Sequence, residues 1–299
     1  MTEFFQALRT LPLLQNALLM GILASIACGV IGTYVVSRRI TSIAGAVAHC
    51  VLGGLGAAKY YQVTHGWAWC HPLLGASVAA VASAMIIGWV SLRAKQREDT
   101  VISAIWSVGM AIGVLYISQT PGYNEDLTGY LFGSILLVSP QDLWLTAALD
   151  AVIVTLGLLF YDRFLAVCFD EEFARLRGIR VELYYLMLLV LTALTVVVLL
   201  KVVGIIMVIA LLTLPAAVAG FFARTLFQMM VISTLIGIGL TSGGLAISYS
   251  PSLPAGATTI VLAGPGYAGA LGAKWVFPGR LRGRATASAV PDSGAGRGN

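Results

Sequence analysis

Long apolar runs separated by short polar segments make up most of the sequence. A helix needs about 20 predominantly apolar residues to cross the hydrocarbon core of a bilayer. By this criterion the pattern predicts an all-α, polytopic membrane protein with eight or nine spanning helices. The runs interpreted as spans are residues 13–36, 43–61, 73–92, 101–117, 143–160, 184–200, 202–222, 226–247 and 257–274.

One further apolar run, residues 130–138, is too short to cross a bilayer. The polar sequence Ser139-Pro140-Gln141-Asp142 separates it from the next predicted span. We interpret this run as a half-helix or re-entrant segment. Such a segment needs surrounding protein to satisfy its free backbone groups.

The distribution of basic residues predicts the orientation, because Lys and Arg are enriched in the cytoplasmic loops of membrane proteins. If residues 130–138 do not cross, five groups of basic residues can all lie on one side, with the N-terminus outside and the C-terminal tail inside. The opposite side then carries His65, His71, Glu125 and Asp126. The basic groups are Arg38 and Arg39; Arg93, Lys95 and Arg97; Arg175, Arg177 and Arg180; Arg224; and Arg280, Arg282 and Arg284.

The composition excludes several classes of protein. Only 10% of the residues are charged, whereas soluble domains have about 25%. No basic face suited to nucleic acid is present. The sequence lacks the Gly-rich phosphate-binding motif and the zinc-protease His-Glu-x-x-His motif. With three histidines in total, we predict that the chain is not an enzyme.

His49 is the main candidate for binding a transported ligand. It lies in the apolar run 43–61, where an ionisable group is costly and often marks a pathway. Neutral imidazole binds Zn²⁺, Mn²⁺ or Fe²⁺, although a histidine hydrogen-bonded between helices is an equally good interpretation. A single imidazole cannot complete a metal site, but a homodimer would bring a second copy to the two-fold axis. Gly45 lies one turn earlier on the same helix face.

Three other sets of residues are weaker candidates. Asp150 lies within the run 143–160, where a carboxylate either serves a function or pairs with a neighbouring polar group. The loop 62–72 carries His65 and His71, which could capture a metal outside, or which could simply flank Trp67 and Trp69 in an interfacial aromatic belt. The small residues Gly53, Gly54 and Gly56 predict close helix packing.

The polar segment from Asp170 to Ile179 has acidic residues first, basic residues later, and Gly178 near its end. This order favours a short helix aligned with its dipole. Phe173 and Leu176 share one face of that helix, which suits the docking of a soluble partner, although an ordinary solvated helix fits as well. We therefore predict a transmembrane permease domain over residues 1–277 and a disordered basic tail over residues 278–299.

Five stretches of the chain, in this order, resemble the permease subunits of the ABC-3 family. These permeases belong to bacterial ABC importers for zinc, manganese and iron, and the resemblance extends from Leu14 to about Ala273. The stretches are Arg38-Arg39 with residues 45–49 (GAVAH), 129–138 (GYLFGSILLV), 169–179 (FDEEFARLRGI), 211–219 (LLTLPAAVA) and 248–258 (SYSPSLPAGAT).

The resemblance implies a fold like that of type II ABC-importer permeases, in the bacterial inner membrane. Two permeases would form a homodimeric pathway past His49, and an extracytoplasmic metal-binding protein would deliver the ion. A separate cytoplasmic ATP-binding subunit would hydrolyse ATP and dock on a coupling helix at about 169–179. No cofactor would be bound permanently. The implied coupling residues are Asp170, Glu171, Glu172, Phe173, Ala174, Arg175, Leu176 and Gly178.

The sequence departs from the family at Gly45, where many members carry an aspartate. Two imidazoles without carboxylates favour zinc over manganese, and iron stays open. Two other classes of transporter fit the residues. A secondary transporter could use Asp150 or His49 as a proton relay, and an ABC permease could carry a metal chelate such as a siderophore. A membrane-embedded enzyme is disfavoured, because no catalytic arrangement is present.

Overall fold

A computed structural model describes residues 2–67, 69–93, 98–121, 140–249 and 253–276. Within these ranges the secondary structure is entirely helical. The predicted half-helix at 130–138 and the predicted tail at 278–299 lie outside them. The helices are α1 (Thr2–Thr10), α2 (Pro12–Ser37), α3 (Thr41–His65), α4 (Pro72–Arg93), α5 (Glu98–Gln119), α7 (Pro140–Leu159), α8 (Tyr161–Phe169), α9 (Glu171–Leu176), α10 (Val181–Val203), α11 (Ile205–Phe222), α12 (Leu226–Tyr249) and α13 (Ala255–Val276).

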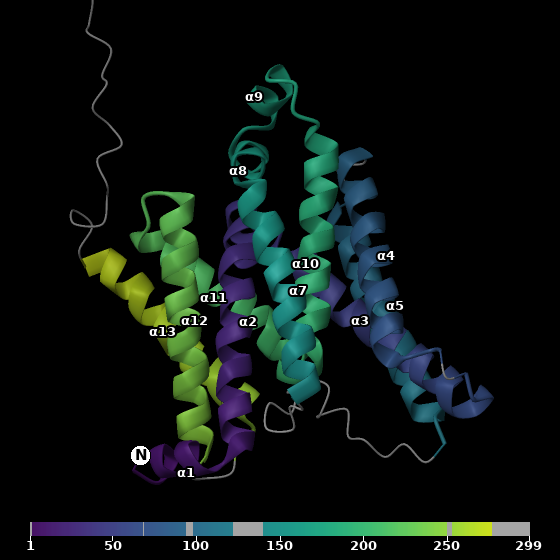
Figure 1. Ribbon diagram of the computed structural model, residues 1–299. Helices are drawn as coiled ribbons and strands as arrows, with labels where there is room; N and C mark the ends of the chain where they lie inside the picture. The colour runs from purple at the N-terminus through teal and green to yellow at the C-terminus, as the bar shows by residue number, and fades with distance from the viewer. Residues whose placement is uncertain (1, 68, 94–97, 122–139, 250–252, 277–299) are drawn as a thin grey trace, which may run out of the picture.

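The long helices form a bundle, with α9 at one end and α1 at the other (Figure 1). Helix α2 contacts α7, α10, α11 and α12, so it lies near the centre of the bundle. Helices α3, α4 and α5 pack together on one side, and α11, α12 and α13 pack together on the other. Helix α10 contacts α2, α3 and α4, and so connects the group containing His49 to the rest of the bundle.

Among the described residues, seven helices are long and apolar enough to cross a membrane, and counting the bent pair α7 and α8 as one span brings the number to eight. This agrees with the predicted eight or nine spans. Residues 257–274 form most of α13, which is not among the seven. The predicted span 143–160 ends at a bend of 68° between Thr146–Leu159 and Tyr161–Phe169.

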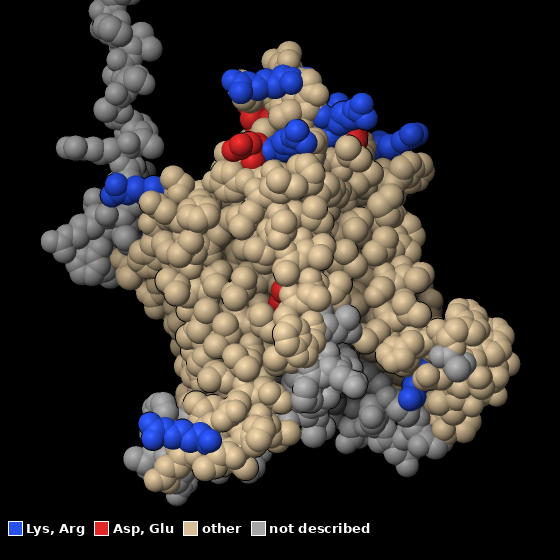
Figure 2. All heavy atoms as spheres, viewed as in Figure 1, with Lys and Arg blue, Asp and Glu red and all other residues tan. Residues whose placement is uncertain are grey.

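Most charged side chains on the face in view lie at the ends of the bundle, and the belt between them carries only a small acidic spot (Figure 2). Basic groups are concentrated at the end formed by α8, α9 and the start of α10. An apolar belt of this kind can face lipid without placing charge in hydrocarbon. The arrangement therefore suits a protein that spans a bilayer along the long axis of its helices.

Glycines set the spacing between α3 and its two neighbours. A Cβ atom built on Gly54 would lie 2.2 Å from the Gly75 carbonyl oxygen of α4. A Cβ on Gly53 would lie 2.7 Å from the Gly109 oxygen of α5, and one on Gly56 would lie 2.8 Å from the Gly113 oxygen. Only a residue without a side chain allows helices to approach so closely.

Candidate functional site

His49 lies on the face of α3 that contacts α5. Its ring stacks on the indole of Trp106, with 4.5 Å between ring centroids and 15° between ring planes. The histidine is half-buried, and its Nδ1 atom is buried with no hydrogen-bond partner among the residues that the structure describes. The imidazole is therefore oriented by ring packing, without a hydrogen bond at Nδ1.

The space beside His49 is open at Gly45. A Cβ atom at this position would have a single near neighbour, Trp106 Cζ3, at 3.6 Å, which is an ordinary van der Waals distance. Trp106 thus contacts the imidazole and also borders the position one turn before it. The glycine is not required by packing here, in contrast to Gly53 and Gly54.

The close glycine contacts place Trp106 against His49. Gly53 follows His49 by about one turn in α3, and Gly109 follows Trp106 by about one turn in α5. Because these two glycines bring the backbones together, the larger rings one turn away meet face to face. The geometry at His49 is therefore a consequence of the α3–α5 packing.

A complete metal site is not formed within one chain. In the described ranges, no three His, Cys, Asp or Glu side chains lie close enough together to hold an ion. His49 supplies one ligand, whereas metals in proteins usually take about four. Within the described ranges, His49 therefore has no second protein ligand beside it.

Asp150 lies on α7, away from the α3–α5 contact. Only 3% of its surface is exposed, and neither carboxylate oxygen has a hydrogen-bond partner in the described part of the chain. Helix α7 packs on α2 and α10, whereas α3 packs mainly on α4 and α5. The structure therefore does not join Asp150 and His49 in one site.

The two outer histidines have different surroundings. His65, at the end of α3, lies in an aromatic cluster, with its ring centroid 5.4 Å from that of Tyr61 and 5.5 Å from that of Trp67. The Nδ1 atom of His71 accepts a hydrogen bond from the backbone N–H of Leu73 at 3.3 Å. Both histidines are exposed. The loop 62–72 was interpreted either as a metal-capture site or as part of an interfacial aromatic belt. The rings around His65 are of the kind that the belt interpretation expects.

The segment predicted as a coupling helix folds into α9, which projects from the end of the bundle (Figure 1). The Asp170 carboxylate caps the helix by accepting a hydrogen bond from the Phe173 N–H at 2.9 Å. Gly178 follows the helix with a φ of 75°, a conformation that favours glycine. Ala174 is buried against the bundle, while Phe173 and Leu176 are 47% and 87% exposed. The helix is thus anchored on one face and presents apolar side chains on another.

Two ion pairs connect α9 to the bundle. Glu171 pairs with Arg38, in the turn between α2 and α3, and Arg38 also lies over the Tyr185 ring of α10. Arg175 pairs with Glu182 at the start of α10, at 2.8 Å. The first pair has side chains that are 23% and 30% exposed, whereas those of the second are half-exposed.

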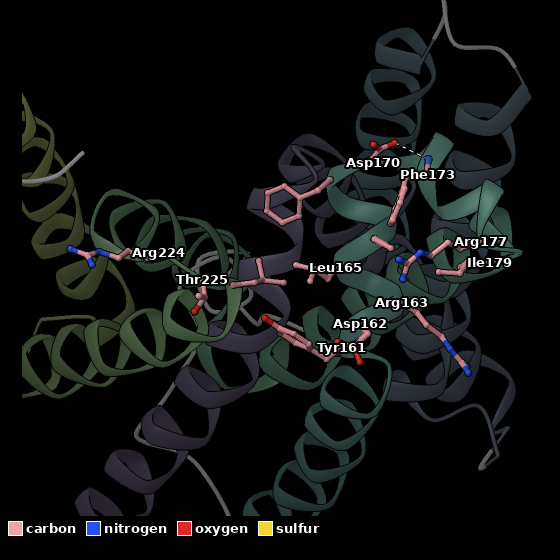
Figure 3. A pocket seen from close by; sticks show the side chains of 13 residues that line it. Tyr161, Asp162, Arg163, Leu165, Asp170, Phe173, Arg177, Ile179, Arg224 and Thr225 are labelled. Atoms are coloured by element: carbon pink, nitrogen blue, oxygen red, sulfur yellow. Dashed lines mark hydrogen bonds between the residues drawn. The ribbon is translucent and has the colours of Figure 1, made fainter. Parts of the chain in front are cut away.

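A cavity of about 860 Å³ lies between α8, α9 and the turn that joins α11 to α12. Figure 3 shows Arg224 and Thr225 on one side of it and Phe173 and Arg177 on the other. Its lining combines apolar side chains with basic and acidic ones, including Asp162 and Asp170. The cavity opens beside α9, at the same end of the bundle as the basic groups.

Residues 10–269 match the ABC 3 transport family, ABC-3. This chain belongs to the ABC 3 transport family. The match covers every described helix except α1 and the end of α13. The fold is that of a multi-pass membrane protein, a component of a transporter.

Relatives and a solved structure with the same fold support this assignment to the ABC 3 transport family. The chain is 41% identical over 248 residues to a probable metal transport system membrane protein of Chlamydia pneumoniae, covering 83% of this chain and 84% of that one. It is 31% identical over 263 residues to the manganese transport system membrane protein MntC of Halalkalibacterium halodurans, covering 88% of each chain. The structure of PsaBC from Streptococcus pneumoniae in complex with Fab matches with a TM-score of 0.80 and 30% identity, over 90% of this chain and 95% of that one.

Three features of this ABC 3 family chain were not predicted from the sequence. They are the stacking of Trp106 on His49, the Arg38–Glu171 ion pair, and the cavity beside α9. Each joins residues that are distant in the sequence. Trp106 lies in an ordinary apolar run, and Arg38 was interpreted as a marker of orientation and as part of a family-like stretch, so neither carried a local signal for its contact.

Proposed function

We propose that this chain is the membrane-spanning permease subunit of an ATP-driven importer of divalent metal ions. The observation that supports this most directly is His49, a half-buried imidazole at membrane depth with an unpartnered Nδ1 atom. Neutral imidazole is a common ligand for divalent transition metals. The names of the relatives, which refer to metal and manganese transport, point in the same direction.

The transport pathway is formed by two copies of the chain. Each copy contributes one imidazole from His49, and the two-fold axis of a homodimer brings the pair together. The cargo ion is bound in transit by these imidazoles together with water. The incomplete ligand set of a single chain supports this arrangement.

Zinc is the preferred cargo, with manganese and iron as further candidates. Imidazole ligands suit Zn²⁺, whereas Mn²⁺ favours carboxylate oxygens. The position one turn before His49 is Gly45, which supplies no ligand. Asp150 is a buried carboxylate, but it lies on α7, which packs on α2 and α10 and does not contribute to the α3–α5 contact.

The energy comes from a separate cytoplasmic ATP-binding subunit that docks on α9. The exposed Phe173 and Leu176 support this role, because apolar side chains that project from a polar end of the bundle suit a protein partner. An extracytoplasmic metal-binding protein delivers the ion to the other end, near residues 62–72. Residues 1–277 then act as one permease domain.

The test of cargo and site is ATP-dependent uptake of radiolabelled zinc, manganese and iron into vesicles that contain the chain with its ATP-binding and metal-binding partners. His49→Ala should lower zinc uptake at least about tenfold, as expected for loss of a metal-binding group. Thr10→Ala, which removes an exposed polar side chain at the end of α1, is the control and should retain uptake. Undiminished uptake by the His49 variant would contradict the proposed site and direct attention to Asp150.

The test of coupling uses α9. Leu176→Ala should weaken binding of the ATP-binding subunit and lower ATP-driven uptake, while the chain still inserts in the membrane. Leu235→Ala is the matched control, because Leu235 is 63% exposed but lies in the middle of α12. Normal ATPase binding by the Leu176 variant would argue against docking at this face.

A further inference from the structure

Trp106 lies flat against the imidazole of His49. The ring centroids are 4.5 Å apart and the planes differ by 15°. The lone pairs with which an imidazole binds a metal lie in the plane of the ring and point outward from its edge. A stacked neighbour covers one face of the ring and leaves that edge free. The contact is therefore compatible with metal binding at His49 and restricts the directions in which the ring can turn.

His49 lacks the usual means of fixing such a ring. Metal-binding histidines almost always donate their second ring N–H to a carboxylate, a carbonyl or water, which sets the orientation of the ring. The Nδ1 atom of His49 is buried and has no partner among the described protein groups. The stacked ring of Trp106 is in a position to hold the plane of the imidazole instead.

The position of the indole is itself fixed by the helix packing. A Cβ on Gly109, one turn after Trp106, would lie 2.8 Å from the Cα of Cys50, the residue next to His49. Helices α3 and α5 therefore touch through their backbones directly beside the stacked rings. An indole on this rigid contact can hold the imidazole more firmly than a side chain on a loop could.

We propose that Trp106 is a positioning residue for metal binding, which fixes the imidazole plane of His49 in place of a hydrogen bond. This inference rests on the proposed role of His49 in binding a divalent cation of the zinc type. Trp106 does not bind the ion. It keeps the nitrogen-bearing edge of the ring directed toward the pathway. The ion then binds a ring that is already oriented, and no free energy is spent on ordering a rotating imidazole.

The experiment measures ATP-driven zinc uptake as a function of zinc concentration in reconstituted vesicles, normalised to folded protein. Trp106→Met, which keeps an apolar side chain but removes the ring, should raise the apparent KM for zinc about tenfold and change kcat little. Trp106→Phe keeps a smaller ring and should raise KM about threefold. Trp89→Met is the matched control, because Trp89 is 58% exposed on α4 and should leave KM unchanged.

The graded order of KM values separates positioning from a general loss of packing, which would lower the amount of folded protein and leave KM unchanged. Wild-type KM values in both Trp106 variants would overturn the inference. If the Met variant does not fold, the Phe variant decides by the same criterion. His49→Ala, measured alongside, tests the proposed function separately: full uptake by that variant contradicts the His49 site itself, whatever the Trp106 variants show.

Discussion

His49 and Gly45 show how two positions on one helix face can set the chemistry of a transport site. Residues four apart lie on the same face of an α-helix, so a side chain at position 45 would lie beside the imidazole. Here that position is open, with only Trp106 Cζ3 nearby at 3.6 Å. At the proposed site, position 45 thus supplies no ligand, although a Cβ atom there would fit without a clash.

The first prediction concerns this open position. Gly45→Asp should raise manganese uptake relative to zinc uptake, because a carboxylate oxygen beside His49 suits Mn²⁺ better than imidazole alone. The ratio of the two uptake rates, measured in competition, tests it. Gly45→Asn, of similar size but neutral, is the control. Equal ratios in the Asp and Asn variants would contradict the prediction.

The residue-scale features differ in how far the sequence could predict them. His49 was predictable as a candidate, because an ionisable residue in an apolar run is unusual in itself. Trp106 was not, because a tryptophan in a spanning helix usually faces lipid or core, and only the α3–α5 register brings it to His49. The unpartnered Nδ1 atom also depends on every neighbouring helix, and so requires the structure.

At the level of elements, α3 is distinguished by its backbone contacts on two sides. Gly54 touches α4, while Gly53 and Gly56 touch α5. Small residues predict such contacts in general, but the partners Gly75, Gly109 and Gly113 follow from the register between helices. The limits of the spanning helices were predictable from hydropathy. The bend between α7 and α8 at Phe160 was not predicted, although Gly157 precedes it and Asp162 and Arg163 follow it.

The second prediction tests the α3–α4 contact. Gly54→Ala should destabilise the protein by about 1–3 kcal/mol or more, because the new Cβ would lie 2.2 Å from the Gly75 oxygen and 2.5 Å from the Ala79 Cβ. The melting temperature in detergent measures the effect. Gly239→Ala is the control, since a Cβ at Gly239 meets nothing within 4 Å and Ala favours helix over Gly. A melting temperature that falls equally in both variants would show that packing at Gly54 is not responsible.

At the level of the whole molecule, the two functional ends of the chain are linked through the α2–α3 turn. Glu171, at the start of α9, pairs with Arg38, and α3 begins at Thr41, only three residues later. His49 lies about two turns further along α3. A displacement of α9 by an ATP-binding subunit would therefore act on the helix that holds the proposed metal ligand. The contact between Arg38 and the Tyr185 ring adds α10 to the same connection.

The third prediction tests this connection through its charges. Arg38→Glu and Glu171→Arg should each reduce the amount of metal transported per ATP hydrolysed, because each places two like charges together at a partly buried contact. The double variant restores opposite charges and should recover much of the coupling, a non-additive result expected only for residues that interact directly. The Arg175–Glu182 pair also joins α9 to α10, but it is half-exposed, so the corresponding swap should change coupling little. If the Arg38–Glu171 double variant is no better than the single variants, this ion pair does not connect α9 to the pathway, and the packing of Ala174 and the Arg175–Glu182 pair remain as links between α9 and the bundle.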